Sequence, residues 1–170
     1  PQSLHGKAQT ELRGSVMNSV SPKKIDEAQA RAHFDTALND HEQSFETFFF
    51  ARFLGLSFEY LPADTADADK EVCRLTFEMT DMLRNPQGSL HGGAMAAAMD
   101  ISMGHLVNKI QGPGATIEMK LQFMRPVMQG RVTCEGRFLK RGRSISFMES
   151  RMWDDQGKLA AVATATWKMP

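Results

Sequence analysis

This chain of 170 residues lacks an excess of charge, a long apolar run and a recognisable cysteine pattern. Its 20 lysines and arginines balance 20 aspartates and glutamates, so the formal net charge is zero. Without a field of one sign, the chain has no general attraction for nucleic acid or for an anionic membrane surface. The longest apolar runs are far shorter than the roughly 20 residues of a membrane-spanning helix. Residues 1–20 also lack the apolar stretch of a secretory signal, so we expect a soluble cytoplasmic protein.

The two cysteines, Cys73 and Cys134, are isolated in the sequence. Neither belongs to a Cys-x-x-Cys pair or to a Cys/His cluster, which argues against a zinc site and against a disulfide framework. We therefore expect two buried thiols and no metal. The length matches roughly one domain and is sufficient to bury a core.

Residues 1–40 are polar and mixed, and we expect an N-terminal extension that is partly helical and mobile at its beginning. Ser21-Pro22 suits the cap and first position of a helix, and the residues that follow to Leu38 have helical composition. The more apolar segment 45–56 is predicted to form a helix that docks on the main body and ends at Gly55. The main domain is expected to occupy residues 41–170.

Alternation of apolar and polar residues predicts strands in much of the main domain. In "VCRLTFEM", four apolar side chains share one face that we expect to be buried: Cys73, Leu75, Phe77 and Met79. In "ATIEMKLQFM" the alternation is strict from Ala115 to Phe123, and it assigns Thr116 to the polar face. Further strands are expected at residues 130–139, 144–153 and 158–167. The connections "KRGR" and "DDQG" between them are predicted hairpins in which glycine takes a positive φ.

The segment between the first strands and the later ones contains one isolated acid. "NPQGSLHGGAMAAAMDISMGHLVNK" has helical composition after its glycines, and Asp100 is its single acidic residue. The residues three and four positions away carry no charge that could pair with it: Ala96, Ala97, Met103 and Gly104. A helix that is apolar nearly all round must be enclosed. The sequence therefore predicts an α+β fold, an antiparallel sheet wrapped around a long central helix, with a four-stranded meander after that helix.

Two motifs in this region carry a resemblance to a known family. "N-P-x-G-x-L-H-G-G" followed by an aspartate nine residues after the histidine, together with "PGATIEMKLQFMRPV", resembles the hot-dog-fold acyl-CoA thioesterases of the phenylacetate-degradation (PaaI-like) type. The resemblance extends over residues 45–167. It implies the hot-dog fold and hydrolysis of a CoA thioester to a carboxylic acid and free CoA, with no metal or redox cofactor. It also implies a homodimer or homotetramer whose active sites are shared between subunits.

By this resemblance, the Gly92 N–H donates to the oxyanion, and His91 helps to orient the site. The first N–H groups of a helix have no helical partner, and the helix dipole there favours negative charge, so the position suits this task. Alternatively, His91 and the two glycines form only a turn at the start of the helix.

The resemblance makes Asp100 a general base or a nucleophile, and apolar neighbours would make its carboxylate a stronger base. Asp100 lies eight positions after Gly92, about 12 Å along a helix, which is too far for both to act on one carbonyl from the same chain. In the family the acid comes from the neighbouring subunit. The alternative is a carboxylate that faces solvent, the usual fate of a lone acid.

Two further residues have a role by resemblance and an ordinary structural alternative. Asn85 would position the attacking water or the thioester, or it is the first residue of an Asn-Pro turn. Thr116 would place a hydroxyl near the acid, or it is an exposed strand threonine. The pair Ser102 and His105 lacks a Gly-x-Ser-x-Gly elbow, so we reject a serine hydrolase.

The phosphates of CoA require cationic partners. Four basic residues are candidates for this contact, although such clusters are most often solvated surface: Arg125, Lys140, Arg141 and Arg143. Two rival functions remain from the sequence. One is a hot-dog dehydratase or hydratase, and the other is a non-catalytic module that binds or senses acyl-CoA.

Overall fold

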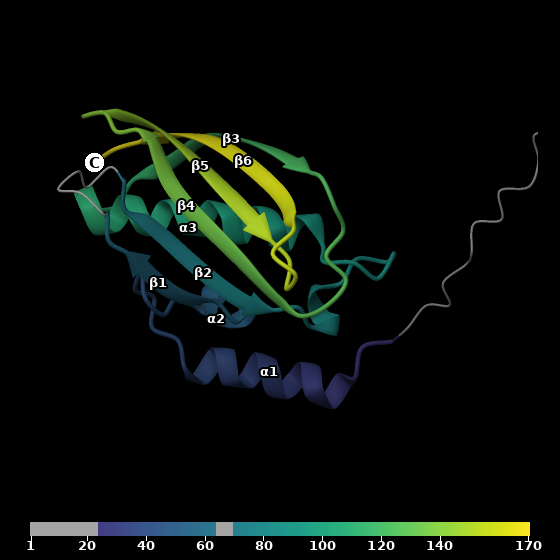
Figure 1. Ribbon diagram of the computed structural model, residues 1–170. Coiled ribbons are helices and arrows are strands. Elements are labelled where there is room, and N and C mark those ends of the chain that lie inside the picture. Colours follow the sequence, from purple (N-terminus) through teal and green to yellow (C-terminus); the bar gives the residue numbers. More distant parts are fainter. Residues whose placement is uncertain (1–23, 64–69) are drawn as a thin grey trace, which may run out of the picture.

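The computed structural model describes residues 24–63 and 70–170 as an antiparallel sheet wrapped around one long helix (Figure 1). The predicted α+β architecture with an enclosed central helix is confirmed. The elements in chain order are α1 (Glu27–Asn39), α2 (Phe49–Leu54), β1 (Ser57–Leu61), β2 (Val72–Glu78), a 3-10 turn (Asp81–Leu83), α3 (Gly92–Gln111), β3 (Ala115–Phe123), β4 (Arg131–Lys140), β5 (Ile145–Trp153) and β6 (Leu159–Lys168).

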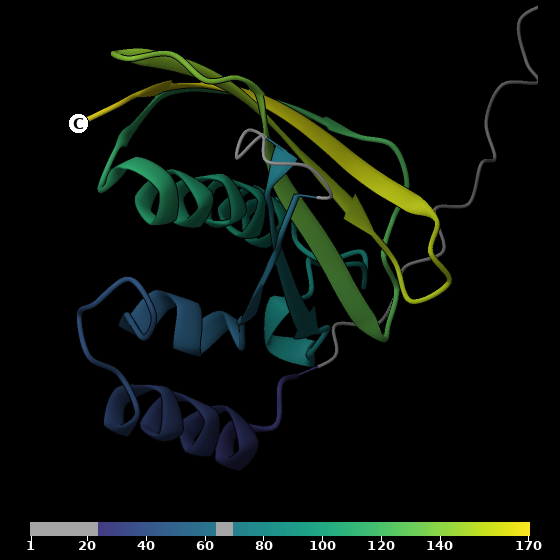
Figure 2. The ribbon, with the colours of Figure 1, turned by 60° about the vertical axis from the view of Figure 1, so that its left-hand side comes forward.

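The sheet has six strands in the order β1-β2-β4-β5-β6-β3, with every pair antiparallel. The predicted four-stranded meander after α3 is wrong, because β3 pairs with β6 at the far edge and β4 pairs with β2. Strand alternation specifies which face of a strand is buried but not which strand lies beside it. Here the chain crosses between β3 and β4, and α3 lies in the concave face that this arrangement encloses (Figures 1 and 2).

The central helix α3 begins with a cap formed by His91. The His91 Nδ1 accepts a hydrogen bond of 2.8 Å from the Gly93 N–H, and its carbonyl oxygen accepts from the Met95 N–H at 3.1 Å. Met99 and Met103 are fully buried against the sheet. Helix and sheet lie close together at Gly136 of β4, where an added Cβ would lie 2.6 Å from the Ser102 carbonyl carbon. Glycine is required there for space.

Strand β2 matches its predicted pattern, with Cys73, Leu75, Phe77 and Met79 buried. Both thiols are free and buried, as expected. Burial raises the pKa of Cys73 to about 12, and burial raises the pKa of Cys134 to about 11. Both are therefore protonated at neutral pH and have little nucleophilic character.

Strand β3 differs from its predicted alternation near its start. Thr116 pairs with Trp167 and Glu118 pairs with Thr166, so Ile117 is the extra residue of a β-bulge. Ile117 is 56% exposed. The bulge puts Thr116 on the same face as Met119, toward α3, and the assignment of Thr116 to the opposite, polar face was wrong. A bulge reverses the direction of the side chains before it, and the pattern of apolar and polar residues does not reveal it.

The two predicted hairpin glycines differ in their backbone. Gly157 has φ +72°, as expected. Gly142 does not have a positive φ, and that prediction was wrong. An added Cβ at Gly142 would collide with the Ile145 carbonyl oxygen, so this position requires the absence of a side chain rather than a left-handed backbone.

The helices that precede the sheet form a separate layer on its open side (Figure 2). Helix α1 is capped by Asp26, whose Oδ1 accepts a hydrogen bond of 3.0 Å from the Gln29 N–H. The predicted start at Ser21-Pro22 and the predicted mobility of the first residues lie outside the described part of the chain. Helix α2 is shorter than predicted, but it ends at Gly55, which has φ +70°. None of the helices in residues 24–63 and 70–170 combines the length and the apolarity that crossing a membrane requires.

Candidate active site

The side chains of Asp100 and Thr116 are hydrogen-bonded to each other. Thr116 Oγ1 donates to Asp100 Oδ1 at 2.8 Å. Asp100 lies on α3 and Thr116 lies at the start of β3, so the contact depends on the bulge at Ile117. Thr116 fixes one oxygen of a half-buried carboxylate and leaves the other available.

Asp100 and Thr116 line a pocket of about 570 Å³. This volume lies within the range typical of small-molecule sites. One wall is a face of α3, and the opposite wall is the segment that leads into α2. The lining residues are Gln43, Ser44, Phe45, Phe48, Phe50, Ala97, Asp100, Ile101, Gly104, His105, Gly114, Thr116 and Trp167.

His105 lines the pocket from α3 and is only 3% exposed. Its ring stacks on Phe58 with 3.9 Å between centroids. Burial lowers the pKa of His105, against a smaller opposing effect of the Glu46 carboxylate. Burial, with smaller contributions from Cys73 and Glu46, raises the pKa of Tyr60 to about 12, so the phenol stays protonated. The Tyr60 hydroxyl lies 3.2 Å from His105 Nδ1 and can donate to it, which makes His105 a neutral part of the wall.

Ser102 and His105 do not form a nucleophile and base pair. Ser102 is fully buried, and its Oγ donates to the Met99 carbonyl oxygen at 2.7 Å and lies 2.9 Å from Ser150 Oγ. The interactions of His105 are with Tyr60 and phenylalanine rings. The geometry agrees with the rejection of a serine hydrolase.

The start of α3 presents the predicted oxyanion donor, Gly92, beside an aromatic ring. An added Cβ at Gly92 would lie 3.4 Å from Phe123 Cζ, so the ring at the end of β3 packs over this glycine. Gly92 is the first residue of α3, and its N–H points out of the helix. His91 is exposed and caps the helix through Nδ1, which places the proton of a neutral imidazole on Nε2.

Asn85 organises a turn, and its side chain is occupied there. Its Oδ1 accepts from the N–H groups of Gln87 and Ser89 at 3.0 and 3.1 Å, and its Nδ2 donates to Ser89 Oγ at 2.9 Å. Asn85 therefore has the turn-forming role that was the alternative to a role in positioning the substrate. The turn leads directly to Leu90, whose N–H donates to the Val127 carbonyl oxygen at 2.8 Å, and so to the start of α3.

The four predicted CoA-binding residues do not lie together in one chain. Arg125 lies beside Ala160 at the beginning of β6, where its N–H donates to the Ala160 carbonyl oxygen. Lys140, Arg141 and Arg143 flank the β4–β5 hairpin, near the opposite end of β6, since Ile145 pairs with Lys168. Ala160 and Lys168 are about 27 Å apart at the rise of an extended strand. One chain therefore cannot direct both sets at the same phosphate.

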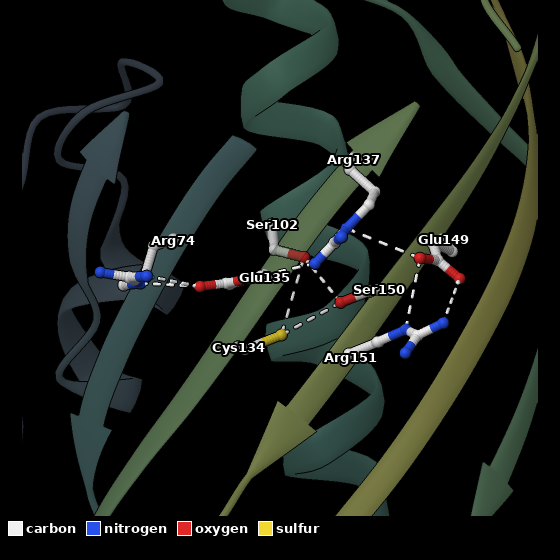
Figure 3. A network of polar contacts seen from close by, with 8 residues as sticks. All are labelled: Arg74, Ser102, Cys134, Glu135, Arg137, Glu149, Ser150 and Arg151. Carbon is white, nitrogen blue, oxygen red and sulfur yellow. Dashed lines mark hydrogen bonds and ion pairs between the residues drawn. The ribbon is translucent and has the colours of Figure 1, made fainter. Parts of the chain in front are cut away.

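Figure 3 shows two polar networks on opposite faces of the sheet. The inner network joins Ser102, Ser150 and Cys134. The outer one is a row of ion pairs across β2, β4 and β5 that sequence reasoning missed, although charged residues alternate along these strands: Arg74–Glu135 (2.7 Å), Arg137–Glu135 (3.1 Å), Arg137–Glu149 (3.5 Å) and Arg151–Glu149 (3.3 Å). This row lies on the convex side, away from the pocket.

Sequence reasoning also missed the aromatic wall of the pocket. The segment 45–56 was predicted only to dock on the main body, whereas Phe45, Phe48 and Phe50 line the pocket. The signal was the phenylalanine-rich run "FETFFF". Among the described residues, no group of three or more His, Cys, Asp and Glu side chains is placed to hold a metal ion.

The fold and site define a hot-dog protein with a carboxylate on its central helix, and comparison with known proteins gives its family. The thioesterase superfamily matches residues 87–161, which include His91, Gly92, Asp100 and Thr116. A Saccharolobus solfataricus protein, provisionally named an esterase, is 30% identical over 117 residues, covering 68% of this chain and 73% of the relative. The chain belongs to the thioesterase superfamily.

Solved structures agree with this assignment. A protein of Ralstonia eutropha, provisionally described as a thioesterase related to phenylacetic acid degradation, is 26% identical with a TM-score of 0.64, covering 81% of this chain and 99% of that one. BH2602 from Bacillus halodurans, solved with CoA, has a TM-score of 0.71 over 88% of this chain and 97% of that one. At 19% identity, this second likeness shows the fold alone. The predicted hot-dog fold and resemblance to the PaaI-like type are confirmed.

Proposed function

We propose that this protein is an acyl-CoA thioesterase that hydrolyses a CoA thioester to a carboxylic acid and free CoA. The observation that carries the proposal is the placement of two groups at opposite ends of one exposed edge strand. Asp100 is hydrogen-bonded to Thr116 at the start of β3, and Gly92 packs against Phe123 at the end of β3. Thr116 and Phe123 are roughly 24 Å apart along the strand.

A two-fold dimer joins these groups into one site. Within the described residues, β3 pairs only with β6, which leaves its other edge open. An open edge is a template for another strand. If β3 pairs with β3 of a second copy in antiparallel fashion, the Phe123 end of the partner lies beside the Thr116 end of this chain. Gly92 of the partner subunit then lies near Asp100, and symmetry forms a second site.

The chemistry follows from these positions. The Gly92 N–H of the partner subunit donates to the thioester carbonyl oxygen, and it stabilises the negative charge that develops there. Asp100 accepts a proton from a water molecule that attacks the carbonyl carbon. The C–S bond then breaks, CoA leaves as the thiol after protonation, and the acyl group leaves as a carboxylic acid. Thr116 holds Asp100 in position, and His91 caps the helix so that its first N–H points at the substrate.

The same pairing suggests where CoA phosphates bind. It brings Arg125 of the partner subunit to the end of the sheet at which Lys140, Arg141 and Arg143 lie. The basic residues that are far apart in one chain would thus lie at the same end of the shared site. BH2602, which shares this fold, was solved with CoA, and this supports CoA as part of the substrate proposed here. No metal takes part in the proposed reaction.

A thiol-release assay tests the proposal. The purified protein is incubated with acyl-CoA esters, and free CoA is measured with a thiol reagent. We expect hydrolysis by the wild type, with kcat lowered about 10²–10⁴-fold in Asp100→Asn. A dehydratase or hydratase would change the acyl chain without releasing a thiol. A binding module would retain acyl-CoA without turnover, and either result would replace the proposed function.

A further inference from the structure

We propose that the segment Gln43–Phe50 selects the acyl group, and that the substrates are CoA esters of uncharged, apolar acyl chains. This inference rests on the proposed thioesterase function and assigns the pocket beside Asp100 to the acyl chain. The segment lies before residue 87, outside the part of the chain that matches the superfamily. The selectivity would therefore come from a part of this chain that the superfamily match does not include.

The segment is held in a fixed shape beside the pocket. The Thr47 N–H donates to Ser44 O, and the Glu42 N–H donates to the Thr47 carbonyl oxygen at 3.1 Å. Gln43 Oε1 accepts from the Phe49 N–H at 2.9 Å, which ties the turn to the first residue of α2. A wall that is ordered before the substrate arrives loses little entropy on binding.

Aromatic rings make up the pocket side of this segment. The ring of Phe45 meets His105 edge-on, with 5.9 Å between centroids, and Phe48 lies 6.2 Å from the same imidazole. Phe50 also lines the pocket although its side chain is 47% exposed. Opposite these rings, Ala97, Ile101 and Gly104 present small or apolar groups from α3. An acyl chain between the two walls buries its surface against carbon on both sides.

The charges of the lining exclude an anionic acyl chain. Asp100 is the one acidic side chain among the described lining residues, and these residues include no lysine or arginine. Burial lowers the pKa of His105, so the imidazole provides no cation at neutral pH. A carboxylate at the end of the acyl chain would enter the pocket without a partner, close to a like charge. Burial of an unpaired charge is strongly unfavourable.

The pocket also sets a direction for the chain. Asp100 and His105 are separated by about 7.5 Å along α3 at the helical rise per residue. A thioester carbonyl near Asp100 therefore directs its acyl chain toward His105 and the phenylalanine rings. Each methylene that enters this space should raise kcat/KM by up to about fourfold, the ratio that corresponds to burial of one methylene.

The test compares matched substrates with the whole 170-residue chain. We expect kcat/KM to rise from butanoyl-CoA to octanoyl-CoA. Hexanoyl-CoA and adipoyl-CoA have the same number of carbons and differ in a terminal carboxylate. We expect adipoyl-CoA to be hydrolysed with kcat/KM at least about a hundredfold lower.

Matched variants locate the selecting residues. Phe45→Ala and Phe50→Ala should each lower kcat/KM for octanoyl-CoA about tenfold and change it less than twofold for butanoyl-CoA. Phe34→Ala is the control, because Phe34 is 45% exposed and packs on Phe49 outside the pocket lining. It should leave the chain-length preference unchanged. Unaltered thermal midpoints would show that the variants are folded.

The possible outcomes separate the two proposals. If the wild type releases no CoA from any ester, the proposed function fails. If CoA is released but kcat/KM is the same for adipoyl-CoA and hexanoyl-CoA, the inference about Gln43–Phe50 is overturned. It is also overturned if Phe45→Ala and Phe50→Ala both keep the chain-length preference that Phe34→Ala shows. Turnover of butanoyl-CoA by the variants excludes misfolding as the cause of a changed preference.

Discussion

The Thr116 hydroxyl donates a hydrogen bond of 2.8 Å to Asp100, because the bulge at Ile117 turns Thr116 toward α3. Without that extra residue, the strand alternation would direct Thr116 to the opposite face of the sheet. The contact thus links a local irregularity of β3 to the carboxylate that we propose as the catalytic base.

Replacement of Thr116 with valine keeps the shape of the side chain and removes the hydrogen-bond donor. A hydrogen bond to a charged group contributes about 1.5–3 kcal/mol, so we expect Thr116→Val to lower kcat/KM roughly 10–100-fold. Thr116→Ser retains the donor and should keep most of the activity. Steady-state kinetics on both variants measure the difference, and equal activities would mean that the hydroxyl does not position Asp100.

Mixed dimers test whether the site spans two chains. Asp100→Asn removes the proposed base, and Gly92→Pro removes the proposed oxyanion donor, a group typically worth about 10²–10³ in kcat. Proline suits the first position of a helix, and His91 has φ −64° and ψ 131°, which a following proline allows. In a mixed dimer one site carries both changes and the other carries neither, so about half of the wild-type activity should return.

This experiment requires differently tagged subunits and a purified heterodimer. Circular dichroism and thermal midpoints must first show that both parent proteins are folded. Heterodimers that are as inactive as their parents would rule out a site shared between subunits in the proposed geometry.

The open edge of β3 is expected to form the dimer interface. Ile117→Lys introduces a charge at this edge, and we expect it to weaken the dimer and make the activity per subunit fall on dilution. Leu139→Lys is a matched control, because Leu139 is also 56% exposed but lies on β4, inside the sheet order. Light scattering measures the mass. A fully active wild-type monomer would contradict the shared site.

Removal of the basic hairpin residues should affect substrate binding. We expect the double variant Arg141→Ala and Arg143→Ala to raise KM more than it lowers kcat, because the phosphate contacts lie away from the carbonyl. Arg125→Ala should act in the same direction if the partner's Arg125 faces the same phosphates. The effects should shrink as salt increases. An unchanged KM at low ionic strength would place the phosphate contacts elsewhere.

The sequence predicted the features that depend on local pattern. The apolar face of β2 and the enclosed helix α3 follow from the spacing of side chains along one segment. The space requirement at Gly142 comes from the Ile145 carbonyl oxygen in the same hairpin. The neighbour order of β3 and β4 and the bulge at Ile117 depend instead on contacts between distant segments. No single segment contains that information.

The candidate site shows the same division. Asp100 stands out in the sequence because it lacks a charged partner on its own helix. Its contact with Thr116 was an expectation from the family resemblance, and the folded sheet is what brings the two side chains within hydrogen-bond distance. The phenylalanine run looked like ordinary docking surface, since its position opposite α3 arises from the way the N-terminal layer packs.

The burial of Cys73 and Cys134 has a practical consequence for the thiol-release assay. Both thiols are protonated and shielded in the folded protein, so a thiol-specific dye should not react with them. The dye would then count CoA alone, with no protein background. When a variant unfolds, its two cysteines become accessible and add a signal proportional to protein concentration rather than to time. The same cuvette can therefore distinguish a loss of catalysis from a loss of structure.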